Sequence, residues 1–229
     1  MNKTKIEWCD VTLPYVKGCK NNCEYCYARK MNDRFKFIPN WNEPQVFPQA
    51  LEKLKSMKPK NIFVNSMSDI GNWSIYWKKM FYCSANKNSQ HNYIFLSKKN
   101  TAYYWWMDIY TKQKNVPSNW FFGFSVDTKE RLWSLLNCKT SRHIDFLSIE
   151  PIMSFINLNA GLWENLRQII IGAETGNRKG KVIPKKEWID SLCQQADEYG
   201  IKVFMKDSLI PIVGEENMRR ELIWNNNNE

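Results

Sequence analysis

Residues 167–174 read "RQIIIGAE", three isoleucines in a row followed by two small residues and an acidic one. A short run of this kind, rich in β-branched residues, is typical of a strand buried on both faces. Similar apolar runs lie at 61–67, 92–98, 120–126, 144–152 and 201–207. A weaker strand is expected over 11–18, because Pro14 interrupts that run.

Longer, mixed stretches separate the apolar runs. Three of them, at 48–58, 129–139 and 185–200, have apolar residues spaced by three and four, which predicts helices. Pro184 and Gly200 bracket the last one as start and stop signals. Strands that alternate with helices at this pace indicate βαβ units and a parallel sheet. The pattern leaves an open doubly wound sheet and a barrel as alternatives.

Polar side chains follow almost every predicted strand. Both architectures place function at the carboxyl ends of the strands, so these residues are the first candidates for a site. They are Asn65, Ser66, Asp69, Ser97, Lys98, Ser125, Asp127, Glu150, Glu174, Lys206 and Asp207. A strand must also become polar where it leaves the core, which is the simpler explanation for any single one of them.

Three of the seven cysteines lie within eight residues, in "GCKNNCEYCYA" at 18–28. Cys19, Cys23 and Cys26 have the spacing C-x3-C-x2-C, which indicates metal binding more than disulfides. A structural zinc site would need a fourth ligand, such as Cys9. A 4Fe-4S cluster held by three thiolates would instead leave one iron open to a small molecule.

The cysteine spacing, with Tyr25 before the third cysteine, resembles the signature of the radical S-adenosylmethionine (SAM) superfamily. The blocks "NIFVNSMSD", "NWFFGFSVDT", "FLSIEPIM" and "IIIGAETG" resemble those of a narrower, phage-associated three-cysteine family of unassigned function. The resemblance runs from Ile6 to about Ser208. It implies an α/β fold with a single, partial TIM-like (β/α) barrel of the radical SAM type.

The same resemblance implies a 4Fe-4S cluster and SAM as cofactors, with Cys19, Cys23 and Cys26 as the iron ligands. SAM would be cleaved reductively to a 5′-deoxyadenosyl radical that abstracts hydrogen from an unknown substrate. Flavodoxin or ferredoxin would be the one-electron donor. The residues expected around the cofactor are Tyr25, Asn65, Ser66, Met67, Ser68, Asp69, Ser125, Asp127, Glu150, Gly172 and Glu174.

Within this set, Asn65 to Ser68 would hold the amino end of SAM, with Asp69 accepting from its ammonium. Ser125 and Asp127 would contact the ribose. Gly172 would let the adenine approach the backbone. Lys206, which is not in this set, would face an anionic substrate. A non-catalytic zinc- or nucleic-acid-binding module is the alternative interpretation of the same cysteines.

The composition bears on partners and location. The net charge of +10 favours a nucleic acid or nucleotide as substrate, although lysines spread along an Asn- and Lys-rich chain would give the same charge. The N-terminus lacks the apolar stretch of a signal peptide and no run could span a membrane, so we expect a cytoplasmic protein. We expect one domain over 1–229, with a C-terminal extension over 209–229 that ends in a disordered tail. The aromatic run "YYWWM" at 103–107 is expected to pack as a helix on the sheet; a platform for bases is the alternative.

Overall fold

The structure, a computed structural model, describes residues 4–106, 117–138, 141, 143–158 and 166–225. The chain forms two compact units, residues 1–121 and 122–229. Seven parallel strands and the helices that follow them give a mixed α/β fold, as the alternating pattern predicts.

The sheet of the first unit has the strand order β1-β4-β5, with all strands parallel. Its strands are β1 (Val11–Thr12), β4 (Asn61–Phe63) and β5 (Asn92–Ser97). The predicted strand at 11–18 is divided at Pro14, and its second half, β2 (Val16–Lys17), pairs antiparallel with β3 (Gln45–Val46). Because proline cannot donate to a strand ladder, the chain leaves the parallel sheet at this point.

The helices of this unit are α1 (Tyr27–Phe35), η1 (Pro48–Ser56), η2 (Ile70–Asn72) and α2 (Ile75–Asn86). The helix expected at 48–58 is present as the 3-10 helix η1, and no side chain caps its N-terminus. The other two predicted helices, which lie in the second unit, are α-helices.

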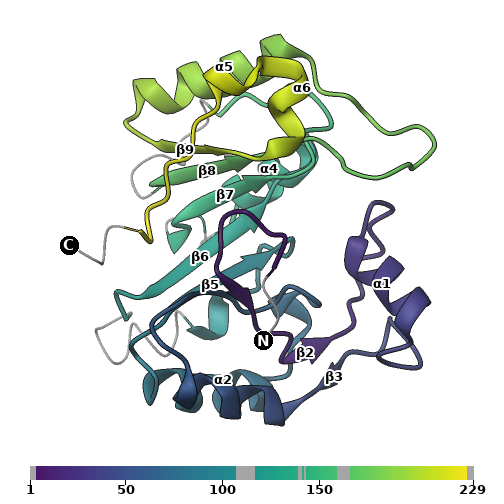
Figure 1. Cartoon of the computed structure of the whole chain (residues 1–229), viewed down its shortest axis with the longest axis vertical. Coiled ribbons are helices and arrows are strands. Elements are labelled where there is room, and N and C mark those ends of the chain that lie inside the picture. The colour runs from purple at the N-terminus through teal and green to yellow at the C-terminus, as the bar shows by residue number, and fades with distance from the viewer. Residues whose placement is uncertain (1–3, 107–116, 139–140, 142, 159–165, 226–229) are drawn as a thin grey trace. The chain divides into compact units, whose positions relative to one another are not determined.

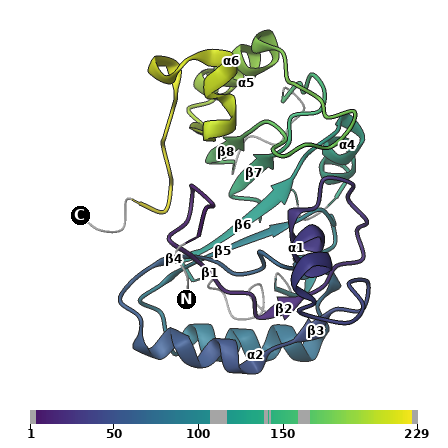
Figure 2. The ribbon, with the colours of Figure 1, turned by 45° about the vertical axis from the view of Figure 1, so that its right-hand side comes forward.

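Helix α2 runs alongside the strands of the first unit (Figures 1 and 2). Buried aromatic side chains make the core between them. The ring of Phe81 on α2 lies 5.6 Å from that of Tyr93 and 5.5 Å from that of Phe95, both on β5. Trp106 is fully buried and packs 5.1 Å from Trp120, so this part of the aromatic run belongs to the core. Met107, the last residue of that run, lies outside the described residues.

The second unit has the strand order β6-β7-β8-β9, again all parallel. Its strands are β6 (Trp120–Ser125), which begins two residues before the unit boundary, β7 (Phe146–Ile149), β8 (Gln168–Ile171) and β9 (Lys202–Met205). A Cβ on Gly123 would lie 2.1 Å from the Phe146 ring. Only glycine therefore lets this ring pack over β6.

The helices of the second unit are α4 (Lys129–Leu136), α5 (Lys186–Glu198), η4 (Asp207–Leu209), α6 (Ile210–Val213) and η5 (Glu215–Asn217). Helix α5 lies against β8 and β9 (Figure 1). Within the C-terminal extension, Arg220 forms an antiparallel bridge with Phe204 and the buried Trp224 packs 5.3 Å from Phe146. The extension therefore packs on the core of this unit through Trp224, and the tail beyond Asn225 lies outside the described residues. No helix in the described part of the chain is long and apolar enough to cross a membrane.

Candidate functional site

The cysteine loop connects β2 to α1 and is fixed at its first residue. Gly18 has φ 104°, and a Cβ there would lie 2.8 Å from Cα of Pro44 and 2.9 Å from the carbonyl oxygen of Trp41. The Gly18 amide donates to the Met67 carbonyl at 3.0 Å, and the next amide, of Cys19, donates to Trp41 at 2.8 Å. The start of the loop is therefore held against the segment 65–69, in which cofactor contacts are predicted.

The three thiols occupy different hydrogen-bonding positions. Cys26 is the N-cap of α1, and its Sγ accepts from the Arg29 amide at 3.4 Å. Cys19 Sγ accepts from the side-chain amide of Asn72 at 3.4 Å. Cys23 Sγ donates to the carbonyl of Asn21 at 3.9 Å. Two of the three sulfurs thus already face N–H donors of the kind that stabilise metal-bound thiolates.

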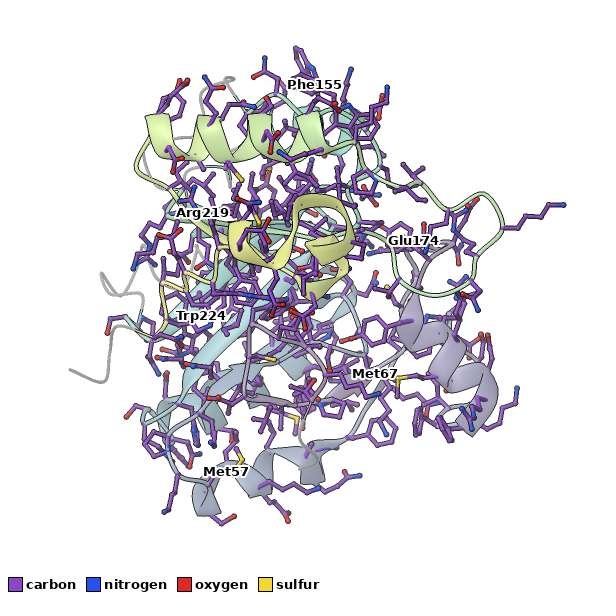
Figure 3. All side chains as sticks on the ribbon, turned by 45° about the horizontal axis from the view of Figure 1, so that its top comes forward. Met57, Met67, Phe155, Glu174, Arg219 and Trp224 are labelled. Atoms are coloured by element: carbon purple, nitrogen blue, oxygen red, sulfur yellow. The ribbon has the colours of Figure 1, made fainter. Side chains whose placement is uncertain are left out.

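Burial shapes the chemistry of Cys19. Desolvation raises the pKa of its thiol to about 11, and the nearby carboxylate of Asp69 and the other two cysteines act in the same direction. A thiolate at this position therefore needs a compensating cation. Cys19 and Cys26 both pack against an apolar cluster of Ala28, Ile38, Trp41 and Met67, and Figure 3 shows Met67 beside α1.

The donor set suits an iron-sulfur cluster, because three thiols come from one loop in a half-buried, largely apolar setting. Among the residues that the structure describes, no three His, Cys, Asp or Glu side chains stand close enough together to hold a metal ion. The loop therefore brings the predicted ligands into one region without placing them in coordination geometry.

Asp69 is the hydrogen-bonding centre of this region. Its Oδ1 accepts from Ser97 Oγ at 2.6 Å and from the Gly71 amide at 2.8 Å. Its Oδ2 accepts from the side chain of Asn21 at 2.6 Å and from the Lys98 amide at 2.9 Å. One buried carboxylate thus joins the cysteine loop, the segment after β4 and the end of β5. A cofactor ammonium would have to share these oxygens, so the geometry favours a positioning role for Asp69.

Asn65 makes a second connection between β4 and β5. Its Nδ2 donates to the carbonyls of Ser68 and Leu96, and its Oδ1 accepts from the Leu96 amide at 3.0 Å. The hydroxyl of Tyr27, the first residue of α1, donates to the Ser66 carbonyl at 2.5 Å. The segment 65–69 is therefore held rigidly beside the cysteine loop, which is what a binding segment requires.

Tyr25 lies within the cysteine loop and contacts Lys98, the residue after β5. The Lys98 ammonium donates to the Tyr25 hydroxyl and lies 4.5 Å from the centre of the ring. The predicted site residues of the first unit are accordingly connected to one another through hydrogen bonds and a cation–π contact.

The other predicted contacts belong to the second unit, where three strand-end carboxylates are each paired with a cation. Asp127 accepts from Arg131 at 2.5 Å, within one helical turn. Glu174 accepts from both Nε and Nη2 of Arg178, at 2.7 and 2.8 Å, and Figure 3 shows it at the start of the long connection to α5. The sequence pattern did not indicate either of these pairs.

Glu150 and Lys206 form the third pair, across the ends of β7 and β9. Lys206 Nζ donates to Oε2 of Glu150 at 2.9 Å, while Oε1 of Glu150 is buried with no hydrogen-bond partner among the described residues. A Cβ on Gly172 would lie 3.1 Å from Cδ of Lys206. Ser125 is buried and stands opposite Ser148 in the β6–β7 ladder. Glu150 thus offers a buried acceptor beside Lys206.

Three residues of the cysteine region were missing from the sequence-based set: Asn21, Asn72 and Lys99. Lys99 Nζ donates to Oδ1 of Asn72 at 2.7 Å, and Asn72 in turn donates to Cys19. Asn72 lies 53 residues from Cys19 in the chain. Neither spacing nor composition signals such a pair, since only the fold brings it together.

Among the comparisons with known proteins, only the one with protein-family models gives a match. The family model described as protein of unknown function (DUF5131) matches residues 3–211, which is most of the chain. No curated protein and no solved structure matches.

Proposed function

The chain belongs to the DUF5131 family, whose description names no function, and we propose that it is a radical SAM enzyme. The observation that carries the proposal is the cysteine loop. The loop that carries Cys19, Cys23 and Cys26 begins at Gly18, where a side chain would not fit. It ends at Cys26, which is the N-cap of α1. The proposed fold is the partial (β/α) barrel that goes with this chemistry, and cytoplasm is the proposed location.

In this proposal the three cysteines hold a 4Fe-4S cluster. When bound and reduced, the cluster would supply one electron to SAM, whose cleavage would give methionine and a 5′-deoxyadenosyl radical able to abstract hydrogen from the substrate. The Arg29 amide at the N-terminus of α1 and the side chain of Asn72 stabilise negative charge on the ligand sulfurs. A flavodoxin or ferredoxin is the proposed electron donor.

The residues around the loop keep it in position and exclude water. Asp69 ties Asn21 of the loop to the end of β5, and Asn65 fixes the adjoining segment. Cofactor contacts from Tyr25 and from Ser66 to Ser68 would then be presented on a rigid support.

In the second unit, Ser125, Asp127, Glu150, Gly172 and Glu174 remain the proposed contacts to SAM or substrate. The buried Oε1 of Glu150 supports its assignment, because a buried acceptor without a partner costs free energy that a ligand donor would recover. Asp127 and Glu174 each have a guanidinium partner, so a bound hydroxyl would join an existing ion pair. A nucleic acid or nucleotide is the proposed substrate class, from the net charge of +10.

Anaerobic purification and reconstitution test this proposal. We expect a brown protein with about four irons per chain that releases 5′-deoxyadenosine when supplied with SAM and dithionite. A colourless protein that binds zinc and leaves SAM intact would favour the alternative, a zinc- or nucleic-acid-binding module without catalysis.

A further inference from the structure

Four large apolar side chains are exposed on and just after α1: Tyr27, Met31, Phe35 and Phe37, with 38–54% of their surface accessible. We call this set the α1 stripe. The first three are spaced by four residues and therefore lie along one side of the helix. The core-facing side of α1 is a different one, since Ala28 and Asn32 are its buried residues. Tyr27 has a contact within the chain, through its hydroxyl bond to Ser66, but packing does not explain why Met31, Phe35 and Phe37 are apolar.

Cations surround the α1 stripe. The Arg34 guanidinium lies 5.0 Å from the centre of the Phe35 ring, and Lys17 Nζ lies 4.8 Å from that of Phe37. Lys36 is exposed between the two phenylalanines in the chain, and Lys30 is exposed next to Met31. Between residues 17 and 37 the chain has six Lys or Arg residues but only two acidic ones. The charge of this face complements a polyanion.

The turn after α1 holds the two phenylalanines in a defined arrangement. Lys36 has φ 51°, and its amide donates to the Asn32 carbonyl at 2.7 Å. The Asn32 side chain bonds both the amide and the carbonyl of Ile38, at 3.0 and 3.1 Å. As a result the Phe35 and Phe37 rings lie 5.7 Å apart at an interplanar angle of 32°. Aromatic groups fixed in this way bind a flat partner at a small cost in conformational entropy.

We propose that the α1 stripe binds single-stranded nucleic acid, with bases stacked on Phe35 and Phe37 and phosphates near Lys30 and Arg34. Aromatic rings interleaved with cations are the usual means of binding a strand without reading its sequence. An acidic protein could pair with the cations, but it lacks the regularly spaced flat groups that stack on exposed aromatic rings. The inference rests on the proposed function in one respect, that a strand held along α1 would lie beside Cys26, the N-cap of that helix.

Fluorescence anisotropy with a labelled oligothymidylate of about 15 nucleotides tests the surface, at two salt concentrations. Phe35→Ala should weaken binding about 5- to 150-fold, the range for loss of one stacked base. Phe35→Tyr should bind like the wild type, whereas Phe35→Leu, which is apolar without a ring face, should behave like the alanine variant. Arg34→Glu should weaken binding and reduce its salt dependence.

Tyr199→Ala is the matched control, because this ring is also about half exposed but follows Asp197 and Glu198 instead of cations. It should leave binding unchanged. An abasic oligonucleotide of the same length and charge should bind more weakly than oligothymidylate, and a polyglutamate peptide should not compete. Equal binding of the abasic strand, competition by polyglutamate, or an unchanged affinity in Phe35→Ala would overturn the proposal.

Oligonucleotide binding by the full chain is measured both without iron and after reconstitution, so that either proposal can be refuted without the other. Oligonucleotide binding without any iron uptake would refute the radical SAM assignment alone. A protein that takes up iron and cleaves SAM but does not bind the oligonucleotide would refute only the proposal that the α1 stripe binds nucleic acid. Circular dichroism confirms that each variant is folded, which we expect because the substituted side chains are exposed.

Discussion

The side-chain amide of Asn72 donates a hydrogen bond to Sγ of Cys19, at 3.4 Å. The other end of that amide accepts from the Lys99 ammonium at 2.7 Å, which polarises it. Cys19 is the most instructive of the three proposed ligands, since burial disfavours its charged form and a neighbouring donor favours it. The Asn72 donor should therefore affect the redox chemistry of anything bound to this sulfur.

Asn72→Leu should lower the reduction potential of the reconstituted cluster while leaving the iron content unchanged. A hydrogen bond to a ligand sulfur stabilises the more negative, reduced state, so its loss makes reduction harder. A redox titration followed by electron paramagnetic resonance measures this shift. Asn42→Leu, at an exposed asparagine of the same unit, is the control. An unchanged potential in Asn72→Leu would show that the amide only supports the loop.

Replacing Cys19, Cys23 or Cys26 by alanine should remove most of the iron and all SAM cleavage, because two thiolates cannot hold a cluster that already has one open iron. Iron and sulfide analysis measures this. Cys193→Ala on α5 should keep its iron and cost about 1 kcal/mol in the free energy of unfolding.

Cys26 needs an additional control, since alanine there also removes the N-cap of α1, at a cost of about 1 kcal/mol. Cys26→Ser keeps an oxygen that can accept from the Arg29 amide but replaces the thiolate. Loss of iron from this variant with unchanged helix content would identify the sulfur as a ligand. Full iron content in any single alanine variant would remove that residue from the ligand set.

Much of the fold could be predicted from apolar runs and breakers. The runs at 92–98 and 120–126 became β5 and β6 almost unchanged, since a strand buried on both faces has few alternatives. The run at 61–67 gave only the short β4, because Asn65 and Asp69 turn the chain through their side-chain bonds. Asn65 also bonds the Leu96 carbonyl and Asp69 also bonds the Lys98 amide, 31 and 29 residues away, so a local pattern cannot reveal these contacts.

The spacing of Cys19, Cys23 and Cys26 singles them out in the sequence, and their role as metal ligands stays a prediction. The state of the carboxylates could not be predicted. Asp69, Asp127 and Glu174 were identified as polar strand ends, yet each is occupied by donors that the sequence did not indicate. Asp69 holds four hydrogen bonds, and the other two each hold a guanidinium. An arginine four residues after a strand end is too common to be read as a partner without a structure.

Lys78 gives the first unit a dependence of stability on pH. It is buried on α2 with its ammonium donating to the Ala102 carbonyl at 3.1 Å, and desolvation lowers its pKa from 10.5 to about 8, against the opposing effect of Asp69. Between about pH 8 and 10.5 the unfolded chain therefore holds a proton that the folded chain has lost. Stability should rise with pH across this window, by up to about 3 kcal/mol in total.

Lys78→Met should remove that rise and make the protein more stable at pH 7, where the wild type bears the full cost of a buried charge. Urea unfolding of both proteins from pH 7 to 10 measures the difference. Tyr15, whose pKa burial raises to about 12, acts in the opposite direction above pH 10, but it is common to both proteins and cancels. Parallel pH profiles for the two proteins would show that Lys78 does not titrate in this window.

Asp127→Ala should weaken SAM binding while leaving the cluster intact. Ser125 ends β6, and Asp127 lies in the bend that follows, so the expectation that both stand on one strand is not met. Both side chains are buried, and the carboxylate of Asp127 can accept from a ribose hydroxyl. One lost hydrogen bond to a charged group corresponds to about 1.5–3 kcal/mol, or about a ten- to hundred-fold change in affinity. A titration of SAM against the reconstituted variant under nitrogen measures this.

The ion pair with Arg131 makes a matched control necessary, because Asp127→Ala also leaves a partly buried guanidinium without its carboxylate. Arg131→Ala breaks the same pair and keeps the carboxylate. If Asp127 contacts the ribose, only its own variant loses SAM affinity, although both lose stability in urea. Equal losses of affinity would mean that the ion pair orders this end of the strand, and Glu150, with its buried acceptor oxygen, would become the leading candidate for the ribose contact. Loss of iron from Asp127→Ala would instead show that the residue supports the fold.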